Sequence, residues 1–426
     1  MTGIECRSIC EGVEFLGVRD PKFKTARMSV HFLLPMQKEH ASENALLPFL
    51  LSRACKKYPD YTKLGQRLAE LYGASLNADV DKVGDVQVLS VAASGLANQY
   101  TINGETVSED LVDLLCGVLF DPPFEDGMFR EQDFEQEKRQ TIELIETELN
   151  DKRFYAKQRC EEIMCEGEPY GVNRYGSKDA VEKLDRPRMT QVWNDVLAHA
   201  RVQILVLGNC EIEPLYERFR QAFSALRREK LAACETVNVK SAASVREAQE
   251  TMEVAQCKLV MGFRTGVCQP QEEVPAMKLA VAVLGGTPSS KLFLNVREKQ
   301  SLCYYCSASY NSMKGIMLVQ SGVEQKNLEK ARTEILAQLD ALKRGDFTDE
   351  EISAARLSLL NAYHSASDSL GALSGWYLTQ AITGRPQTLE EATAAIEAVT
   401  REELIEAANQ ITLDTVYSLL GKGTEE

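Results

Sequence analysis

The chain has 426 residues, of which 44% are hydrophobic, 26% charged and 7% aromatic, and its net formal charge is −15. This composition is typical of a globular protein and excludes an intrinsically disordered chain. The length exceeds what one hydrophobic core usually supports, which predicts two or more domains. The excess of negative charge would repel a phosphate backbone, so nucleic acid is not expected as a partner.

The N-terminal segment MTGIECRSICEGVEF contains no long apolar run. It therefore predicts neither a signal peptide nor a membrane anchor, and no later apolar stretch is long enough to cross a bilayer. We expect a cytoplasmic protein without a membrane partner. The 12 cysteines are scattered along the chain, and some, such as Cys116, lie in apolar stretches. This distribution favours free thiols in a reducing compartment.

The first half of the chain alternates between strand-like and helical patterns. Leu46, Leu47 and Leu50 follow helical spacing, and Ser108 is expected to cap a later helix. The predicted elements are, in chain order, a strand over 26–34, helices over 42–57 and 62–71, a strand over 86–95, a helix from 108 to 121, a polar helix over 128–149 and a strand over 202–208.

The second half repeats this order after a polar stretch without a periodic pattern. Two capping boxes, Thr348 with Glu351 and Thr400 with Glu403, predict helix starts. The predicted elements are a strand over 258–264, a helix over 275–284, a strand over 315–323 and three further helices.

This repetition predicts two similar α+β domains in tandem, each a mostly antiparallel sheet with helices packed on one face. We place the N-terminal domain at 1–228, a linker at 229–250 and the C-terminal domain at 251–426.

Residues 285–310 read GGTPSSKLFLNVREKQSLCYYCSASY. This segment resembles the second-domain signature of the M16B (insulinase and mitochondrial processing peptidase-like) zinc peptidases, in which a glycine-rich turn leads to a helix with an arginine and then a strand with a tyrosine. The resemblance places these residues on Arg297 and Tyr304, and implies that they bind the substrate backbone and stabilise the reacting carbonyl. A guanidinium and a phenol are suitable donors for an oxygen that gains negative charge. Gly285 and Gly286 would let the substrate approach the backbone.

The resemblance extends along nearly the whole chain and implies two homologous M16-type (LuxS/MPP-like) domains. Residues 111–145 are similar to two first-domain helices, and 348–373 to the matching part of the second domain. Residues 46–74 resemble most the YfmF-like group of Gram-positive bacteria. That group is usually accompanied by a YmfH-like M16B chain that keeps the zinc motif, so the resemblance implies such a partner.

The zinc motif itself is missing from this chain. Active members hold zinc with His-x-x-Glu-His on one helix, where the glutamate acts as general base, and with a glutamate from a later helix. Here the two histidine positions fall on Pro48 and Ser52, and the base position falls on Leu51. The later ligand falls near Leu144, and the adjacent Glu143 is interpreted as a solvated helix residue because a shift of one residue turns a side chain by about 100°.

The remaining metal-ligating residue types do not replace this motif. The chain has four histidines, at 31, 40, 199 and 364, and no two of them are four residues apart. Cys303 and Cys306 form a Cys-x-x-Cys pair, but residues three apart on a strand should face opposite sides, so the two sulfurs are expected to diverge. No second such pair completes a ligand set. We therefore expect no metal or other cofactor in this chain, with zinc held by the partner.

These observations lead to three hypotheses. In the first, the chain is a non-catalytic subunit of a heterodimeric M16B metallopeptidase that acts on peptides, and Arg297 and Tyr304 complete the partner's active site. In the second, it is a catalytically inert M16-like scaffold or interaction protein. In the third and weakest, it is an independent hydrolase with unusual ligands. The sequence leaves open the peptide substrate, the pathway and whether the chain forms a homodimer without its partner.

Overall fold

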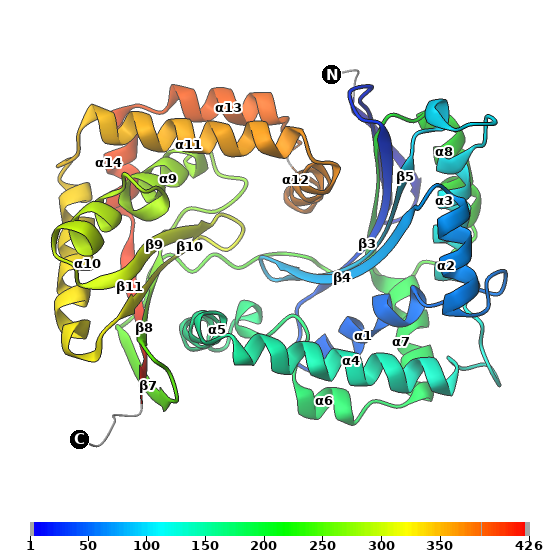
Figure 1. The fold of residues 1–426 in the computed structure, drawn as a ribbon, viewed down its shortest axis with the longest axis horizontal. Coiled ribbons are helices and arrows are strands. Elements are labelled where there is room, and N and C mark those ends of the chain that lie inside the picture. The colour runs from blue at the N-terminus through cyan, green and yellow to red at the C-terminus, as the bar shows by residue number, and fades with distance from the viewer. Residues whose placement is uncertain (1–3, 385, 422–426) are drawn as a thin grey trace. The chain divides into compact units, whose positions relative to one another are not determined.

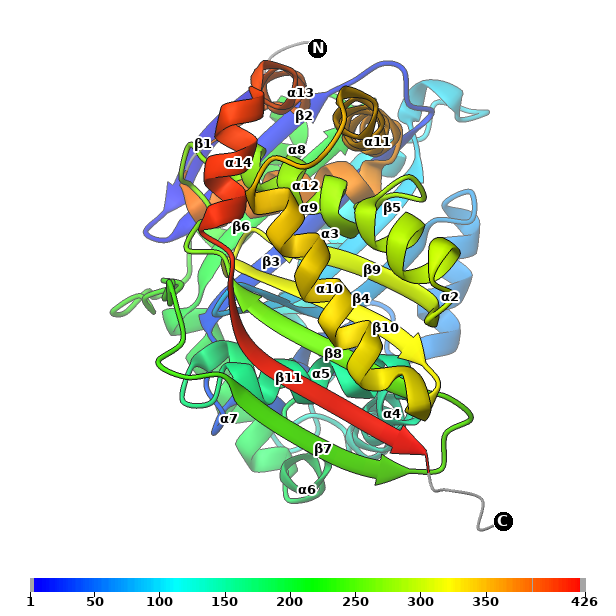
Figure 2. The same ribbon diagram turned by 90° about the vertical axis from the view of Figure 1, so that its left-hand side faces the viewer.

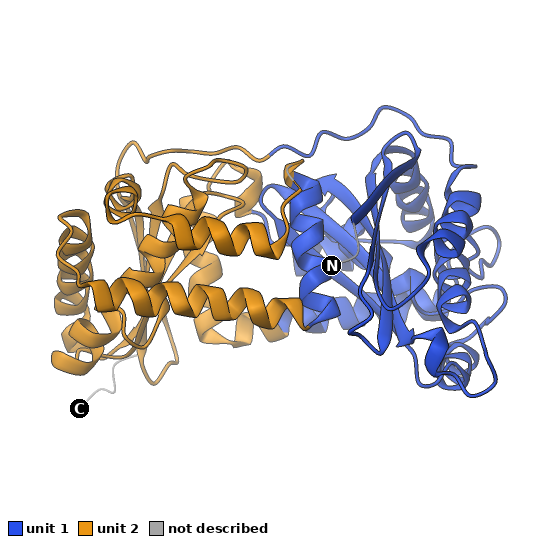
Figure 3. Cartoon of the chain, turned by 90° about the horizontal axis from the view of Figure 1, so that it is seen from above, with its two compact units in different colours: residues 1–146, 172–235, 369–382 blue, residues 147–171, 236–368, 383–426 orange. Residues whose placement is uncertain are grey.

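The computed structural model describes residues 4–384 and 386–421, which fold into two units (Figures 1 and 3). Unit 1 comprises residues 1–146, 172–235 and 369–382, and unit 2 comprises residues 147–171, 236–368 and 383–426. Each unit combines one mostly antiparallel sheet with several helices, which confirms the predicted α+β class. No helix in the described ranges is both long and apolar enough to cross a membrane.

The sheet of unit 1 has six strands in the order β1-β2-β6-β3-β5-β4. Strands β2 and β6 are parallel, and the other neighbouring pairs are antiparallel. Met28, Val30 and Phe32 point into the main core because they alternate along β3 with residues of the opposite face. The strands are β1 (Ile4–Cys10), β2 (Val13–Arg19), β3 (Thr25–Pro35), β4 (Ser75–Val83), β5 (Val86–Leu96) and β6 (Arg201–Gly208).

The helices of unit 1 differ from the sequence prediction at two points. The first helix ends at Leu51 rather than at 57, because the chain then forms a turn in which the backbone groups of Cys55 and Tyr58 bond to each other. Ser108 does not cap its helix: it lies inside α3, and its amide donates to Asn98 Oδ1 at 2.9 Å. The helices are α1 (Ala41–Leu51), α2 (Tyr61–Glu70), η1 (Asn98–Tyr100), α3 (Val107–Phe120), α4 (Glu131–Asn150), α6 (Lys178–Glu182), α7 (Arg186–His199) and α8 (Ile212–Phe223).

The sheet of unit 2 has five strands in the order β7-β11-β8-β10-β9, which Figure 2 shows side by side. Strands β7 and β11 are parallel, and the other pairs are antiparallel. Strand β7 begins at Arg246, so the last residues of the stretch expected to be a linker belong to the sheet. The strands are β7 (Arg246–Met252), β8 (Cys257–Arg264), β9 (Cys303–Asn311), β10 (Ile316–Val323) and β11 (Thr412–Gly421).

The helices of unit 2 confirm both predicted capping boxes. Thr348 and Thr400 each accept a hydrogen bond from the glutamate amide three residues later, and Thr388 forms a third capping box that the sequence prediction missed. Within the described residues, five α-helices follow β10 rather than the three expected. The helices of unit 2 are α5 (Lys152–Met164), η2 (Pro169–Gly171), α9 (Val274–Val281), η3 (Ala282–Gly286), η4 (Leu292–Lys299), η5 (Gln325–Asn327), α10 (Leu328–Lys343), α11 (Asp349–Ser367), α13 (Leu389–Ala398) and α14 (Arg401–Asn409).

The two sheets share one topology. The order β2-β6-β3-β5-β4 in unit 1 matches β7-β11-β8-β10-β9 in unit 2, with the parallel pair at the same place, and β1 has no counterpart among the described strands of unit 2. The edge strands β4 and β9 therefore occupy equivalent positions, as do the helices α1 and α9 that follow β3 and β8. This agreement supports the expected repetition of one domain type along the chain.

Each unit also includes a helix from the other half of the sequence. Helix α5 belongs to unit 2, where Cys160 and Met164 pack against Val260 and Leu318 of the sheet. Most of α12 (Leu370–Thr383) belongs to unit 1. Because these helices contact the sheet face opposite the main core, helices lie on both faces of each sheet and not on one face alone.

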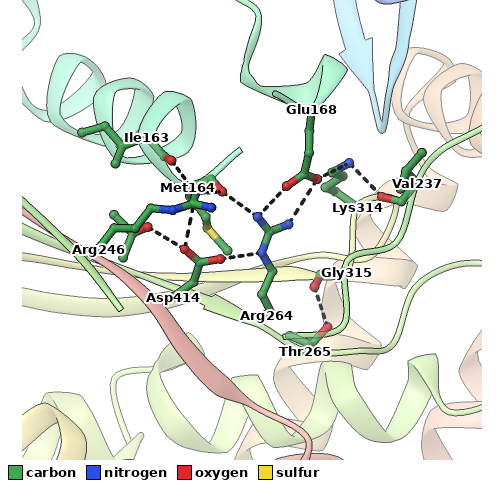
Figure 4. Close-up of polar contacts among 11 residues, drawn as sticks. Ile163, Met164, Glu168, Val237, Arg246, Arg264, Thr265, Lys314, Gly315 and Asp414 are labelled. Carbon is green, nitrogen blue, oxygen red and sulfur yellow. Dashed lines mark hydrogen bonds and ion pairs between the residues drawn. The ribbon is translucent and has the colours of Figure 1, made fainter. Parts of the chain in front are cut away.

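A buried ionic network fixes the α5 segment in unit 2 (Figure 4). The Arg264 side chain is 1% exposed, and its Nε donates to Asp414 Oδ2 at 2.8 Å. Its terminal nitrogens donate to both carboxylate oxygens of Glu168, at 2.6 and 3.2 Å, and to the Met164 carbonyl at 2.6 Å. One guanidinium thus joins β8, β11 and the end of α5.

Two further cations complete this network. The Lys314 ammonium group is fully buried, lies 2.9 Å from Glu168 Oε2 and donates to the Val237 carbonyl at 2.8 Å. Arg246 donates to the Ile163 carbonyl at 2.6 Å and so caps the last turn of α5. Burial alone would raise the pKa of Glu168, but the hydrogen bonds from Arg264 and Lys314 outweigh burial and lower it.

Candidate functional site

The glycine-rich turn at the end of η3 has a packing role. Gly285 is buried, and a Cβ atom there would lie 2.6 Å from the amide nitrogen of Ala308 in β9. Only a residue without a side chain allows this close approach of helix and strand. The backbone of Gly285 is thus covered by β9, which argues against the expected substrate contact at this residue. Gly286 is exposed.

Arg297 lies on η4, a helix with the wider π-type turn. Leu292 and Val296 anchor η4 in the core of unit 2, and Arg297 follows on the outer side with its side chain 38% exposed. Its guanidinium lies over the Phe293 ring, 4.5 Å from the centroid, and 3.5 Å from Glu298 Oε1. The aromatic ring orients the cation while leaving donors of its planar fork accessible to solvent.

Tyr304 lies at the start of β9 and is 56% exposed. The pairing register explains this exposure. Gly322 of β10 lies opposite Tyr305 of β9, and the next residue of β10, Val323, lies opposite Cys303. Tyr304 is therefore the extra residue of a β-bulge, and bulges commonly redirect one side chain out of the regular alternation.

The same bulge makes the prediction for the Cys-x-x-Cys pair wrong. Because one residue is inserted between them, Cys303 and Cys306 both point to the buried face, with exposed fractions of 9% and 4%. The two thiols lie near enough for each to shift the pKa of the other, and they do not diverge. The rule that residues three apart face opposite sides holds for a regular strand, and nothing in the sequence announced the bulge.

The elements that carry these residues pack together in unit 2. Strand β9 is an edge strand that pairs with β10 and with no other strand of the described chain. Its other edge therefore presents backbone N–H and C=O groups that no strand ladder uses. Helices η3 and η4 both contact β9, and the positive charge of Arg297 acts on Cys303, the residue before Tyr304. The segment singled out by sequence thus packs together at one edge of the unit 2 sheet.

The positions that correspond to the zinc motif form part of the unit 1 core or cap its helix. Pro48 and Leu51 are buried in α1, with Leu51 only 1% exposed. The Ser52 hydroxyl donates to the Phe49 carbonyl at 3.1 Å. Leu144 on α4 is 41% exposed to solvent. In the part of the chain that is described, no group of three or more His, Cys, Asp or Glu residues could hold a metal ion.

His31 is buried in a chain of hydroxyl groups on the face of β3 opposite the main core. His31 Nδ1 lies 2.7 Å from the Ser90 hydroxyl, and Nε2 lies 2.9 Å from Ser29 Oγ. Ser29 Oγ is 3.3 Å from the Ser374 hydroxyl of α12. Burial, and secondarily the charge of Arg27, lowers the pKa of His31 to about 3. No sequence pattern indicated this cluster, because its members come from three distant segments.

Comparisons with known proteins agree with this geometry. The model of a family described as peptidase M16 inactive domain matches residues 183–359. "Probable inactive metalloprotease YmfF" of Bacillus subtilis is 31% identical over 408 residues, which are 96% of this chain and 95% of that protein. A conserved protein from Enterococcus faecalis, known from its crystal structure, superposes with a TM-score of 0.91 at 29% identity, covering 99% of this chain and 100% of that one.

A more distant structure shows the same fold. The peptidase M16 inactive domain from Pseudomonas fluorescens matches with a TM-score of 0.79 and 15% identity, over 99% of each chain. Two α+β units of this topology define an M16-type peptidase fold. The chain belongs to the M16 peptidase family and is a homologue of a probable inactive member of it, YmfF. The group label expected from the sequence was YfmF-like, and the relative's name corrects it to YmfF.

Proposed function

We propose that this chain is the non-catalytic subunit of a two-subunit M16B metallopeptidase, in which it positions a peptide for a zinc-bearing partner. The observation that carries the proposal is the contrast between two sites on one fold. The donors of the second-domain signature, Arg297 and Tyr304, are solvent-exposed, whereas Pro48 and Leu51 stand buried at zinc-motif positions. A chain of this kind can bind a peptide but needs a partner for hydrolysis.

The chemistry of the exposed residues supports a role in binding and polarising a peptide carbonyl. Arg297 offers several N–H donors in a fixed plane, and the Tyr304 hydroxyl offers one more. Donors aimed at an oxygen that becomes negative lower the barrier for acyl transfer, and removal of one such donor typically costs about 100- to 1000-fold in rate. The neighbouring edge of β9 would hold an extended peptide by main-chain hydrogen bonds.

The proposed partner is an M16B chain that keeps His-x-x-Glu-His, of the YmfH-like kind. It would supply the metal and the general base, and this chain would supply Arg297 and Tyr304 in trans. The net charge of −15 favours basic over acidic peptides as substrates through long-range attraction. On this account the chain itself needs no metal or other cofactor.

The test is co-purification with such a partner, followed by peptide cleavage by each chain alone and by the mixture. We expect a stable complex and cleavage only in the mixture, with about one zinc per complex, contributed by the partner, since a catalytic site of this type holds a single ion.

Full activity of the partner alone would contradict the proposal and favour the alternative of an inert scaffold. A zinc equivalent in the purified single chain, together with cleavage by that chain, would instead favour an independent hydrolase. A scaffold would still bind its partner, so binding and cleavage have to be measured on the same preparations.

A further inference from the structure

The two buried thiols at the start of β9 lie on one face of the strand, which brings them within the range considered for a disulfide. In the register with β10, Cys306 lies opposite Ser321 and Cys303 opposite Val323. The bulge therefore compresses three residues of β9 into the length of two on the partner strand. Two strand residues span about 6.6 Å, and disulfides form at Cα separations up to about 6.8 Å. This regular spacing would place the pair at the upper end of the usable range.

The surroundings of this pair fix its geometry and distinguish its members. Ser321 is fully buried and its hydroxyl donates to the Tyr305 carbonyl at 3.0 Å, which holds the backbone beside the bulge. The hydrogen bond from the Cys306 thiol is the largest influence that lowers the pKa of Cys303, and the positive charge of Arg297 acts in the same direction. The same hydrogen bond and burial raise the pKa of Cys306.

We propose that Cys303 and Cys306 form a reversible disulfide in response to peroxides, and that this bond changes how the bulge presents Tyr304. The pair differs from the other cysteines of unit 2 because the bulge places both sulfurs on one face of one strand. Cys160 and Cys165, also buried, lie in and after helix α5 and not on one face of a strand.

The reaction needs only hydrogen peroxide as oxidant. The Cys303 thiolate attacks one peroxide oxygen, the O–O bond breaks, and the released hydroxide takes up a proton to become water. The sulfur of Cys306 then attacks the sulfenic acid on Cys303, its thiol proton leaves with the departing hydroxyl as a second water, and the S–S bond forms. The two sulfurs together lose two electrons, which the peroxide receives, and a small-molecule dithiol reverses the change.

The consequence for activity follows from the position of Tyr304. A disulfide would draw the two Cα atoms together and tighten the bulge, whose extra residue is Tyr304. Displacement of a substrate-positioning group by about 1 Å can cost on the order of 100-fold in rate. This second part rests on the proposed function, whereas disulfide formation itself does not.

The first experiment maps oxidation on the wild-type chain. The reduced protein is treated with increasing hydrogen peroxide, its free thiols are alkylated, and peptides are analysed by mass spectrometry. We expect the peptide containing Cys303 and Cys306 to lose two hydrogen atoms, to resist alkylation and to recover both thiols after dithiothreitol. The exposed Cys6 serves as an internal gauge of peroxide dose, and Cys160 and Cys165 as buried controls that stay reduced.

Two variants identify the attacking sulfur. In Cys306→Ser, Cys303 should accumulate as sulfenic acid that a dimedone probe captures, whereas in Cys303→Ser, Cys306 should stay reduced. The proposal is overturned if Cys303 and Cys306 remain alkylatable at doses that fully oxidise Cys6, or if Cys303 pairs with another cysteine. Since the mapping uses wild-type protein, it stands even if a variant folds poorly.

The second experiment adds the zinc-bearing partner. We expect kcat/KM for peptide cleavage to fall by about 10-fold or more after oxidation and to recover on reduction, while the Cys303→Ser complex does not respond to peroxide. An unchanged rate in a complex with a mapped disulfide contradicts control of Tyr304. A mixture that is inactive even when reduced contradicts the proposed function and leaves the mapped disulfide in place.

Discussion

The edge strands β4 and β9 occupy equivalent places in two sheets of the same topology, yet they differ in regularity. Strand β4 pairs with β5 in an unbroken antiparallel register from Ser75 to Val83. Strand β9 contains a bulge, presents Tyr304 to solvent and packs against the helix that carries Arg297. The irregular copy thus carries the exposed donors, as expected where a fold is adapted to bind a ligand.

Helix α1, which follows β3, provides a second comparison. The resemblance places the zinc-motif positions on helix α1, which here buries Pro48 and Leu51 and ends at Leu51 with Ser52 as its C-cap. The fold of unit 1 therefore does not need a metal ligand at these positions, because apolar packing holds the helix. At these positions unit 1 has apolar packing, whereas β9 and η4 of unit 2 carry the exposed donors on which the proposed peptide binding rests.

The largest effect on stability is expected from Arg264→Ala in unit 2. The substitution leaves the carboxylates of Asp414 and Glu168 buried without their main partner, so the free energy of unfolding should fall by about 3–5 kcal/mol. Urea unfolding measures the change. Arg344→Ala is the matched control, since the Arg344–Asp346 pair has side chains 63% and 60% exposed and should change stability by less than about 1 kcal/mol. Equal losses for both variants would show that the buried network does not hold α5.

A loss of about 2–5 kcal/mol is expected for Leu51→Ala in α1, because the side chain is 1% exposed and its removal leaves a cavity. Leu144→Ala, at another position equivalent to a zinc ligand, should change stability by about 0.5 kcal/mol or less, since Leu144 is 41% exposed. Thermal and urea unfolding of both variants give the comparison. A negligible effect of Leu51→Ala would show that this helix position is not part of the core.

The pH dependence of unit 1 should reveal the buried His31. In the folded protein the pKa of His31 is about 3, whereas in the unfolded chain it is near 6.5. Between these two pH values the unfolded chain binds a proton on His31 that the folded protein does not bind. The contribution of His31 to the free energy of unfolding is therefore complete above about pH 6.5 and is lost as the pH falls toward 3. Between pH 7 and 5 the free energy of unfolding should fall by about 2 kcal/mol.

Urea unfolding of wild type and His31→Gln at both pH values checks this prediction, with His364→Gln, at an exposed position, as control for the loss of one histidine. We expect a weaker pH dependence in the His31 variant alone. The same slope in wild type and the His31 variant would contradict the assignment.

The smallest effect expected is loss of one helix cap. Thr388 accepts a hydrogen bond from the Glu391 amide at 3.1 Å, and Thr388→Ala should cost about 1 kcal/mol. The control is Thr379→Ala, whose hydroxyl donates to the Gly375 carbonyl in the same turn of a helix and does not cap it. Thermal unfolding resolves a difference of this size, and equal effects of the two substitutions would argue against the capping role.

Local patterns were enough to predict five of the eleven described strands and two capping boxes. Strands β3, β5, β6, β8 and β10 are apolar over several residues and lie within a residue or two of their predicted bounds. The repeated topology was also visible as a repeated order of elements. These features depend on near neighbours in the chain, which a sequence displays directly.

Features set by distant parts of the chain were missed. The apolar pattern of α5 or α12 does not say which sheet it covers, and the buried network joins Arg264 to Asp414, 150 positions away. The bulge at Tyr304 is fixed by the pairing of β9 with β10, so its effect on Cys303 and Cys306 was hidden as well. The ending of α1 depended on a turn between Cys55 and Tyr58, which the helical pattern did not reveal.

The most direct test of the central claim is the kcat/KM of the complex with a zinc-bearing partner that contains Arg297→Ala in this chain. The account predicts unchanged assembly and a loss of about 100-fold or more in kcat/KM, with Tyr304→Phe also slower and Arg344→Ala unaffected. Wild-type kcat/KM in the Arg297→Ala complex would contradict the claim that this chain completes the partner's active site.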